Sequence, residues 1–221
     1  MDKAMWDKIA AAGGLIGAVL FVVGALIFGD PPDVTASASS VADFYTDNRG
    51  QVLWGTFFQG LGVIAIIWFF AALTTAMRAA DEARLATATA MGFVLAFAIG
   101  AVSLLVRTGL AFTVAQDADA ELVQAVHNTG VYLDLATGLI AAAFYLAVGG
   151  AIIRSGMLAS WWGWVSTVVG LWSIVASTGW GRDGFWSPDG VGLVNFVVFL
   201  VWLAVTSILL TMRAPTRTSA T

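Results

Sequence analysis

Six long apolar runs constrain the fold of this chain more than any other feature. They cover residues 9–29, 51–76, 86–107, 131–153, 161–180 and 191–211. A helix needs about 20 predominantly apolar residues to cross a hydrocarbon core about 30 Å thick. The runs therefore predict an all-α polytopic bundle of six transmembrane helices, forming a single domain over residues 1–213. The polar residues 214–221 are expected to form a disordered tail.

Composition excludes an ordinary soluble domain. The chain is 59% hydrophobic and 11% charged, whereas soluble domains carry about 25% charged residues. A soluble protein of 221 residues could not keep this much apolar surface away from water. The first run is longer than the ~7–15 residues of a secretory signal core. We therefore interpret it as a retained span, with cleavage near residues 36–38 as the alternative.

The distribution of lysine and arginine predicts the orientation, because these residues concentrate on the cytoplasmic side. With the N-terminus and C-terminus cytoplasmic, the inner side holds seven of them: Lys3, Lys8, Arg78, Arg84, Arg154, Arg213 and Arg217. The outer side then holds three: Arg49, Arg107 and Arg182. The opposite orientation would reverse this ratio.

Small residues spaced four apart predict close packing between helices in lipid. They occur in three sets: Gly13 and Gly17; Ala88, Gly92, Ala96 and Gly100; and Ala143, Ala147 and Ala151. Packing within one bundle is the simpler interpretation, and a seam between two copies of the chain is the alternative.

The first outer loop, residues 30–50, contains a short amphipathic pattern. Ser40 followed by Asp43 resembles a helix capping box, and Val41, Phe44 and Tyr45 then share one face. We expect a short helix on the outer membrane surface or over the mouth of the bundle. Plain loop packing and a lid over a site are both compatible with this pattern.

Two opposite charges fall at the same depth on consecutive spans. Counting about 20 residues outward from Arg154 reaches Asp134, and a similar count from Leu85 ends beside Arg107. Charges at this depth pair with one another or face the bundle interior, so an Arg107–Asp134 pair is predicted. The pair can be structural or can belong to a binding site. The helix carrying Asp134 either begins near Asp119 or is broken at Gly130.

Other polar side chains are expected at the same outer level. The candidate binding residues are Arg107, Asp134, Gln59, Asn195, His127 and Tyr132. The inner halves of the spans offer mainly hydroxyl groups that can bond to their own helix backbone. This distribution favours an outward-facing polar pocket over a continuous ion path, which needs polar lining throughout.

Tryptophan is abundant, with 10 residues. Most lie near the expected membrane boundaries, as interfacial belts do. Trp68, Trp172 and Trp202 lie deeper, and we expect them to pack between helices.

Residues that carry catalysis or hold cofactors are scarce. The chain has no cysteine and a single histidine, and neither a Gly-x-Ser-x-Gly elbow nor a His-Glu-x-x-His motif occurs. We predict no catalytic residues, no metal site and no cofactor. The net charge of −4 gives no basic field for nucleic acid.

Residues 154–175, RSGMLASWWGWVSTVVGLWSIV, resemble an inner-loop signature of small six-span integral membrane proteins of actinobacteria. Leu158, Trp161, Gly163 and Trp164 match it, although Ala159 and Ser160 stand where a proline is usual. Residues 41–55 are similar to the first outer loop and second span of that group. The group is a domain of unknown function, so the resemblance implies no catalytic residues.

We therefore expect a multi-pass protein of the bacterial cytoplasmic membrane. The predicted role is a non-enzymatic binding, accessory or scaffold protein with a polar pocket at its extracytoplasmic mouth. The alternative is a small transporter or channel subunit for a solute or lipid. Expected partners are the lipid bilayer and a second copy of the chain or another membrane protein.

Overall fold

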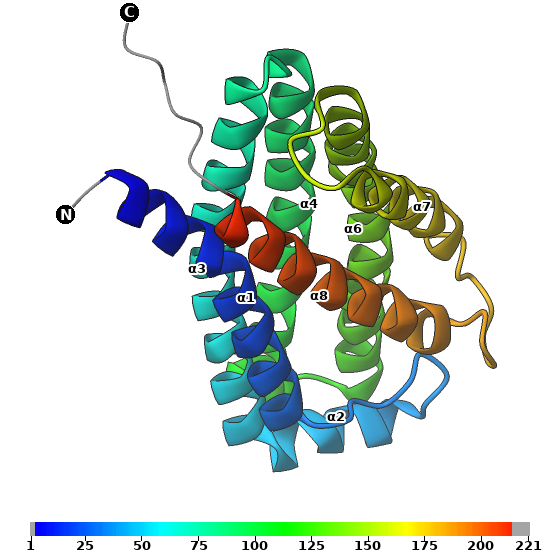
Figure 1. The fold of residues 1–221 in the computed structure, drawn as a ribbon. Helices are drawn as coiled ribbons and strands as arrows, with labels where there is room; N and C mark the ends of the chain where they lie inside the picture. Colours follow the sequence, from blue (N-terminus) through cyan, green and yellow to red (C-terminus); the bar gives the residue numbers. More distant parts are fainter. Residues whose placement is uncertain (1–2, 214–221) are drawn as a thin grey trace, which may run out of the picture.

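A computed structural model describes residues 3–213, and all regular secondary structure in this range is helical (Figure 1). The predicted tail, residues 214–221, lies outside the described residues. The helices are α1 (Lys3–Phe28), α2 (Ala38–Asp47), α3 (Arg49–Ala79), α4 (Ala83–Gly109), the π-helix η1 (Leu110–Val114), α5 (Ala115–Asp117), α6 (Ala120–Ser155), α7 (Ser160–Ala176) and α8 (Pro188–Met212).

Five of these helices are long and apolar enough to cross a membrane, so the chain has the helices of a multi-pass membrane protein. They are α1, α3, α4 with its extension to Asp117, α6 and α8. The fifth predicted run, 161–180, forms α7, which is only 17 residues long and is not among these five helices. Its helix ends at Ala176 because Ser177–Gly179 form turns instead.

The two ends of the bundle differ and are named here by what they carry. The cap end carries α2, which lies across the lower end of the bundle in Figure 1. The turn end carries the tight α3–α4 connection around Asp81 and the α6–α7 connection at Gly156, whose φ is +64°. The start of α1 and the end of α8 lie away from α2 (Figure 1).

Close helix contacts form at several of the small residues that predicted them, and these contacts lie within one copy of the chain. Ala88 is an exception, because it is exposed. A side chain on Gly13 or Gly17 would collide with α3 at Ala65 or Ile66. On α4, a side chain on Gly92 would press on Phe144 of α6, and Ala96 is fully buried. The bundle interpretation therefore accounts for these contacts without a second copy.

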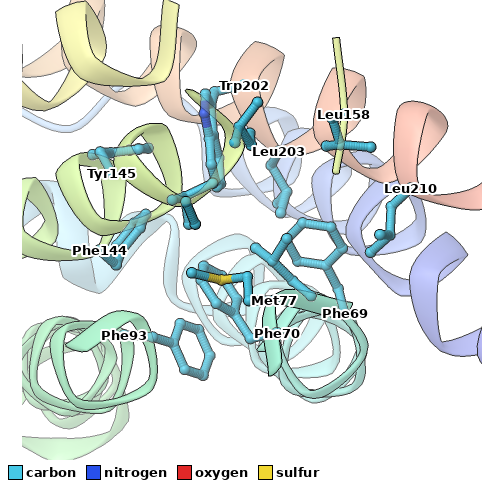
Figure 2. Close-up of a cluster of buried hydrophobic side chains, with 14 of the residues drawn as sticks. Phe69, Phe70, Met77, Phe93, Phe144, Tyr145, Leu158, Trp202, Leu203 and Leu210 are labelled. Atoms are coloured by element: carbon cyan, nitrogen blue, oxygen red, sulfur yellow. The ribbon is translucent and has the colours of Figure 1, made fainter. Parts of the chain in front are cut away.

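Aromatic rings fill the centre of the bundle (Figure 2). Phe70 of α3 stacks on Phe93 of α4 with ring centroids 3.9 Å apart, and Trp202 of α8 meets Tyr145 of α6 edge-on at 4.9 Å. Trp202 is buried as predicted. Trp68 contradicts the same prediction, because it points outward and is 56% exposed.

Two tryptophans also bind α7 to α8 through hydroxyl groups. The Trp202 indole donates to Ser166 Oγ at 2.9 Å, and the Trp162 indole donates to Thr206 Oγ1 at 3.0 Å. Each hydroxyl in turn donates to the backbone carbonyl of the tryptophan on its own helix. Every polar group in this buried contact thus has a partner, as an apolar surrounding requires.

The cap has its own small apolar cluster, separate from the bundle core. Val41 and Tyr45 of α2 are fully buried against apolar residues of α1, α3, η1 and α6: Phe28, Val52, Leu110, Ala111 and Val123. The predicted amphipathic helix is therefore present. The predicted capping box is wrong, because Ser37 is the N-cap and its side chain accepts the N–H of Ser40.

Candidate functional site

The predicted ion pair is present between α4 and α6. An Arg107 Nη donates to Asp134 Oδ2, and the guanidinium also lies 5.8 Å from the Phe28 ring centroid. The Arg107 side chain is 21% exposed and that of Asp134 is 44% exposed. The pair therefore sits at the edge of the bundle, beneath the cap, and is not sealed in the interior.

Asp134 lies in the middle of a continuous helix. α6 begins at Ala120, after Asp119, and runs through Gly130 without a break. Asp119 occupies the N-cap position but its side chain makes no capping bond. Of the two predicted alternatives, the start near Asp119 is confirmed and the break at Gly130 is wrong. The Gly130 carbonyl also accepts a hydrogen bond from Ser103 Oγ of α4 at 3.0 Å. No helix terminus is available to stabilise the carboxylate of Asp134.

A second ion pair, which sequence reasoning missed, joins the same two helices at the turn end. Arg154 Nε donates to Glu82 Oε1 at 3.0 Å. Asp134 and Arg154 are about 20 residues apart on α6, or about 30 Å along its axis. This is the thickness of a bilayer's hydrocarbon core. The two pairs are therefore separated along α6 by about the thickness of such a layer.

His127 is the buried centre of the cap and is only 1% exposed. Its Nε2 lies 3.0 Å from the carbonyl oxygen of Pro32, and its Nδ1 lies 2.8 Å from the Tyr45 hydroxyl. A carbonyl only accepts, so Nε2 carries the proton and Nδ1 accepts from Tyr45. Both ring nitrogens are thus engaged, and the imidazole has no free position for a substrate.

Three α6 side chains hold the segment between α1 and α2 by its backbone. Besides His127, Gln124 Nε2 donates to the Ala36 carbonyl at 2.6 Å and Asn128 Nδ2 to the Val34 carbonyl at 3.4 Å. The three donors lie on one face of α6. Their acceptors are the carbonyls of every second residue from Pro32 to Ala36. The cap is consequently attached by specific hydrogen bonds as well as by apolar contact.

The Tyr45 side chain is fully buried in the cap, which affects its ionisation. Burial raises the pKa of the Tyr45 hydroxyl to about 12, with Arg107 lowering it and Asp134 raising it by smaller amounts. The phenol is therefore neutral at physiological pH and serves as a fixed hydrogen-bond donor.

The remaining predicted site residues lie apart from the ion pair. Asn195 Oδ1 accepts from Ser173 Oγ at 3.2 Å, and the Asn195 amide packs against Gly138. Gln59 is half-buried and lies beside Gly24 of α1. Tyr132 is 51% exposed. Among the described residues, the only hydrogen bond between two of the six candidates is the one between Arg107 and Asp134.

A π-helical turn directly above Arg107 was also missed from the sequence. It spans Leu110–Val114 and turns Leu110 and Ala111 into the cap cluster, where both are buried. A π-turn changes the direction in which the following residues face. The apolar composition of this segment gives no signal for a π-turn. The predicted span ends at Arg107, before this turn begins.

The residues that carry the family resemblance have separate structural roles. Trp161 and Trp164 are exposed on α7, and Leu158 is buried. A side chain on Gly163 would press on Ile153, so this glycine allows α7 to approach α6. No protein-family model, curated protein or solved structure matches this chain. The resemblance stays a prediction.

Several polar and charged side chains at the cap end are engaged with one another. His127 and Tyr45 are occupied with each other, and Arg107 and Asp134 neutralise one another. Within the part of the chain that the structure describes, no three His, Asp or Glu side chains are positioned to hold a metal ion.

Proposed function

We propose that the chain crosses the bacterial cytoplasmic membrane six times, with both termini cytoplasmic and the cap end outside. The seven-to-three distribution of lysine and arginine supports this orientation, because the seven belong to the turn end, the N-terminus and the C-terminus. The distance of about 30 Å along α6 between the two ion pairs equals the thickness of the hydrocarbon core, which supports placing one pair at each membrane boundary.

The arrangement of α7 supports its being a span in addition to the five longer helices. It runs antiparallel to α8, since Trp162 pairs with Thr206, Ser166 with Trp202, and Ser173 with Asn195. It therefore passes from the turn end to the cap end. Its 17 residues are at the lower limit of about 17 for a spanning helix.

The function that the geometry favours is a non-enzymatic binding, accessory or scaffold role with recognition at the cap end. The observation that carries this proposal is the cap itself, a preformed structure held by the side-chain hydrogen bonds of His127, Gln124 and Asn128. A rigid surface of this kind suits recognition because little ordering is needed on binding. The alternative, a transporter or channel subunit, requires the cap to open and a polar path to form beneath it.

The orientation can be tested by labelling single cysteines, because the natural chain has none. Arg84→Cys places a thiol at the turn end, and Asp183→Cys places one in the exposed α7–α8 connection. In intact cells, a membrane-impermeant maleimide should label position 183 and should label position 84 only after the membrane is opened. The reverse pattern would overturn the orientation.

The function can be tested by photocrosslinking in native membranes. A benzophenone amino acid replaces Tyr132 at the cap end or Trp161 at the turn end, both of which are exposed. We expect a discrete protein adduct from position 132 and none from position 161. Lipid adducts alone at both positions would contradict the proposal. Solute flux in proteoliposomes that is abolished by Asp134→Asn would favour the transporter alternative instead.

A further inference from the structure

α1 and α8 are in close contact at Gly14 and Ser207. A side chain on Gly14 would lie 2.9 Å from the Ser207 Cβ, so only glycine permits this approach. The Ser207 hydroxyl donates to the Ala11 carbonyl at 2.6 Å and accepts from the Leu15 N–H at 3.0 Å. It thereby enters the backbone hydrogen-bond ladder of α1 and fixes the crossing point.

Beyond this point the two helices are held apart by aromatic rings. Phe21 of α1 packs on Phe196 and Phe199 of α8, with ring centroids 6.2 and 6.4 Å apart. A groove of about 310 Å³ lies between the helices, with walls that include Leu15, Ala18, Val19, Val22, Val201 and Ala204. These residues belong to the central part of each helix, within the apolar layer.

The size and lining of the groove select its occupant. Water is excluded, because aliphatic walls offer it no hydrogen-bond partner. A partner helix is about 10–12 Å across with its side chains, so this volume would hold less than one turn of it. A single extended hydrocarbon chain matches the aliphatic lining.

Charge along α1 selects the end from which such a chain enters. Lys8 is exposed and lies on the same stripe of α1 as Leu15, Val19 and Val22, about 10 Å from Leu15 toward the turn end. The neighbouring Asp7 is also exposed but lies about 100° around the helix, to one side of this stripe. At the cap end, α1 is followed by Asp30 and α8 begins beside Asp189, both of which repel a phosphate. An anionic headgroup is therefore favoured at Lys8 and disfavoured at the opposite end.

We infer that the α1–α8 groove binds an anionic glycerophospholipid from the leaflet at the turn end. Its phosphate lies at the Lys8 ammonium, and one acyl chain follows the exposed face of α1 past Leu15 into the groove. This inference rests on the membrane embedding and is independent of the role proposed for the cap.

The test measures lipid retained by the full-length chain after reconstitution and mild detergent extraction. The chain is exposed to equal amounts of dioleoyl phosphatidylglycerol and dioleoyl phosphatidylcholine, and bound lipid is counted by native mass spectrometry. We expect about one phosphatidylglycerol per chain. Lys8→Gln should lower its retention roughly fivefold, since one lysine contributes about 1 kcal/mol to anionic lipid binding.

Two matched pairs of variants separate this site from general lipid association. Val19→Phe fills the groove from an exposed position and should abolish retention, whereas Val197→Phe, at an exposed position outside the groove, should not. Arg84→Gln removes another exposed turn-end cation and should leave retention unchanged. Equal retention of both lipids, or equal losses in test and control variants of unchanged melting temperature, would overturn the inference.

Discussion

The cap end and the turn end of the bundle are built in different ways. At the turn end, α3 joins α4 through a short turn at Ala80–Glu82, and one ion pair, Glu82–Arg154, ties α4 to α6. At the cap end, α6 continues for about 14 residues, or about 20 Å, beyond Asp134. The added length carries a second apolar cluster, a buried histidine and a short helix.

The comparison shows where the chain carries structure beyond what crossing a membrane requires. A turn and a boundary charge pair are sufficient to reverse a helical hairpin, and the turn end has little else. The cap end adds groups that must be buried and hydrogen-bonded, which costs conformational entropy. This difference is the reason to seek recognition at the cap end.

The largest expected effect is that of Tyr45→Ala on the cap. Losing a buried aromatic ring costs about 3–5 kcal/mol, which should favour detachment of α2. Hydrogen exchange of the α2 amides should accelerate while that of α4 and α6 near Glu82 stays unchanged. Tyr132→Ala, at an exposed position, is the control and should change stability by less than about 0.5 kcal/mol. Unchanged α2 protection in Tyr45→Ala would show that the cap does not depend on this cluster.

A smaller effect is expected from Tyr45→Phe, which keeps the ring and removes only the hydroxyl. His127 Nδ1 then loses its donor in a buried place, at a cost of about 1–3 kcal/mol in the free energy of cap opening. The same exchange measurement applies, with Tyr132→Phe as the matched control. If Tyr45→Phe and wild type exchange alike, apolar contact alone holds the cap.

Double-mutant cycles should rank the two ion pairs. We expect Arg107→Ala and Asp134→Ala to couple by about 0.5–1 kcal/mol, with the double variant less destabilised than the two single effects combined. The Glu82–Arg154 pair should couple by less, about 0.2–0.5 kcal/mol, because the Arg154 side chain is 72% exposed. Thermal melting in detergent measures both cycles. Additive losses at Arg107 and Asp134 would show that this pair does not stabilise the fold. A larger coupling energy for Glu82–Arg154 than for Arg107–Asp134 would contradict the predicted ranking.

The smallest effect should come from Asp33 in the segment that leads to α2. Hydrogen bonds from the Thr35 hydroxyl, and then from the Thr35 N–H, hold the pKa of the Asp33 carboxyl below its ordinary value of 3.8. Because the folded-state pKa is lowered, this contribution is present above pH 3.8 and is lost as the pH falls through the folded value. Thr35→Ala should therefore weaken the cap slightly at pH 6 and should match wild type at pH 2. A constant difference between the two proteins at both pH values would exclude this carboxylate as the cause.

Depth along a helix was predictable from the sequence, whereas the direction of a side chain around the helix was not. Arg107 and Asp134 were predicted to meet because both lie at the outer limit of consecutive apolar runs, and they do meet. His127 and Tyr132 are five residues apart and were assigned to the same site. One is buried against Tyr45, and the other faces outward.

The sequence by itself determined that the chain is a helical multi-pass membrane protein with a short amphipathic helix at one end. Hydropathy and periodicity suffice for this, because each helix must satisfy its backbone hydrogen bonds internally and match the apolar layer locally. Only the tertiary structure decided that α2 seals the cap through His127, that Glu82 meets Arg154, and that α1 and α8 cross at Gly14 and Ser207. These contacts depend on which helices are neighbours and on how each helix is rotated about its own axis. Hydropathy along the sequence predicts neither.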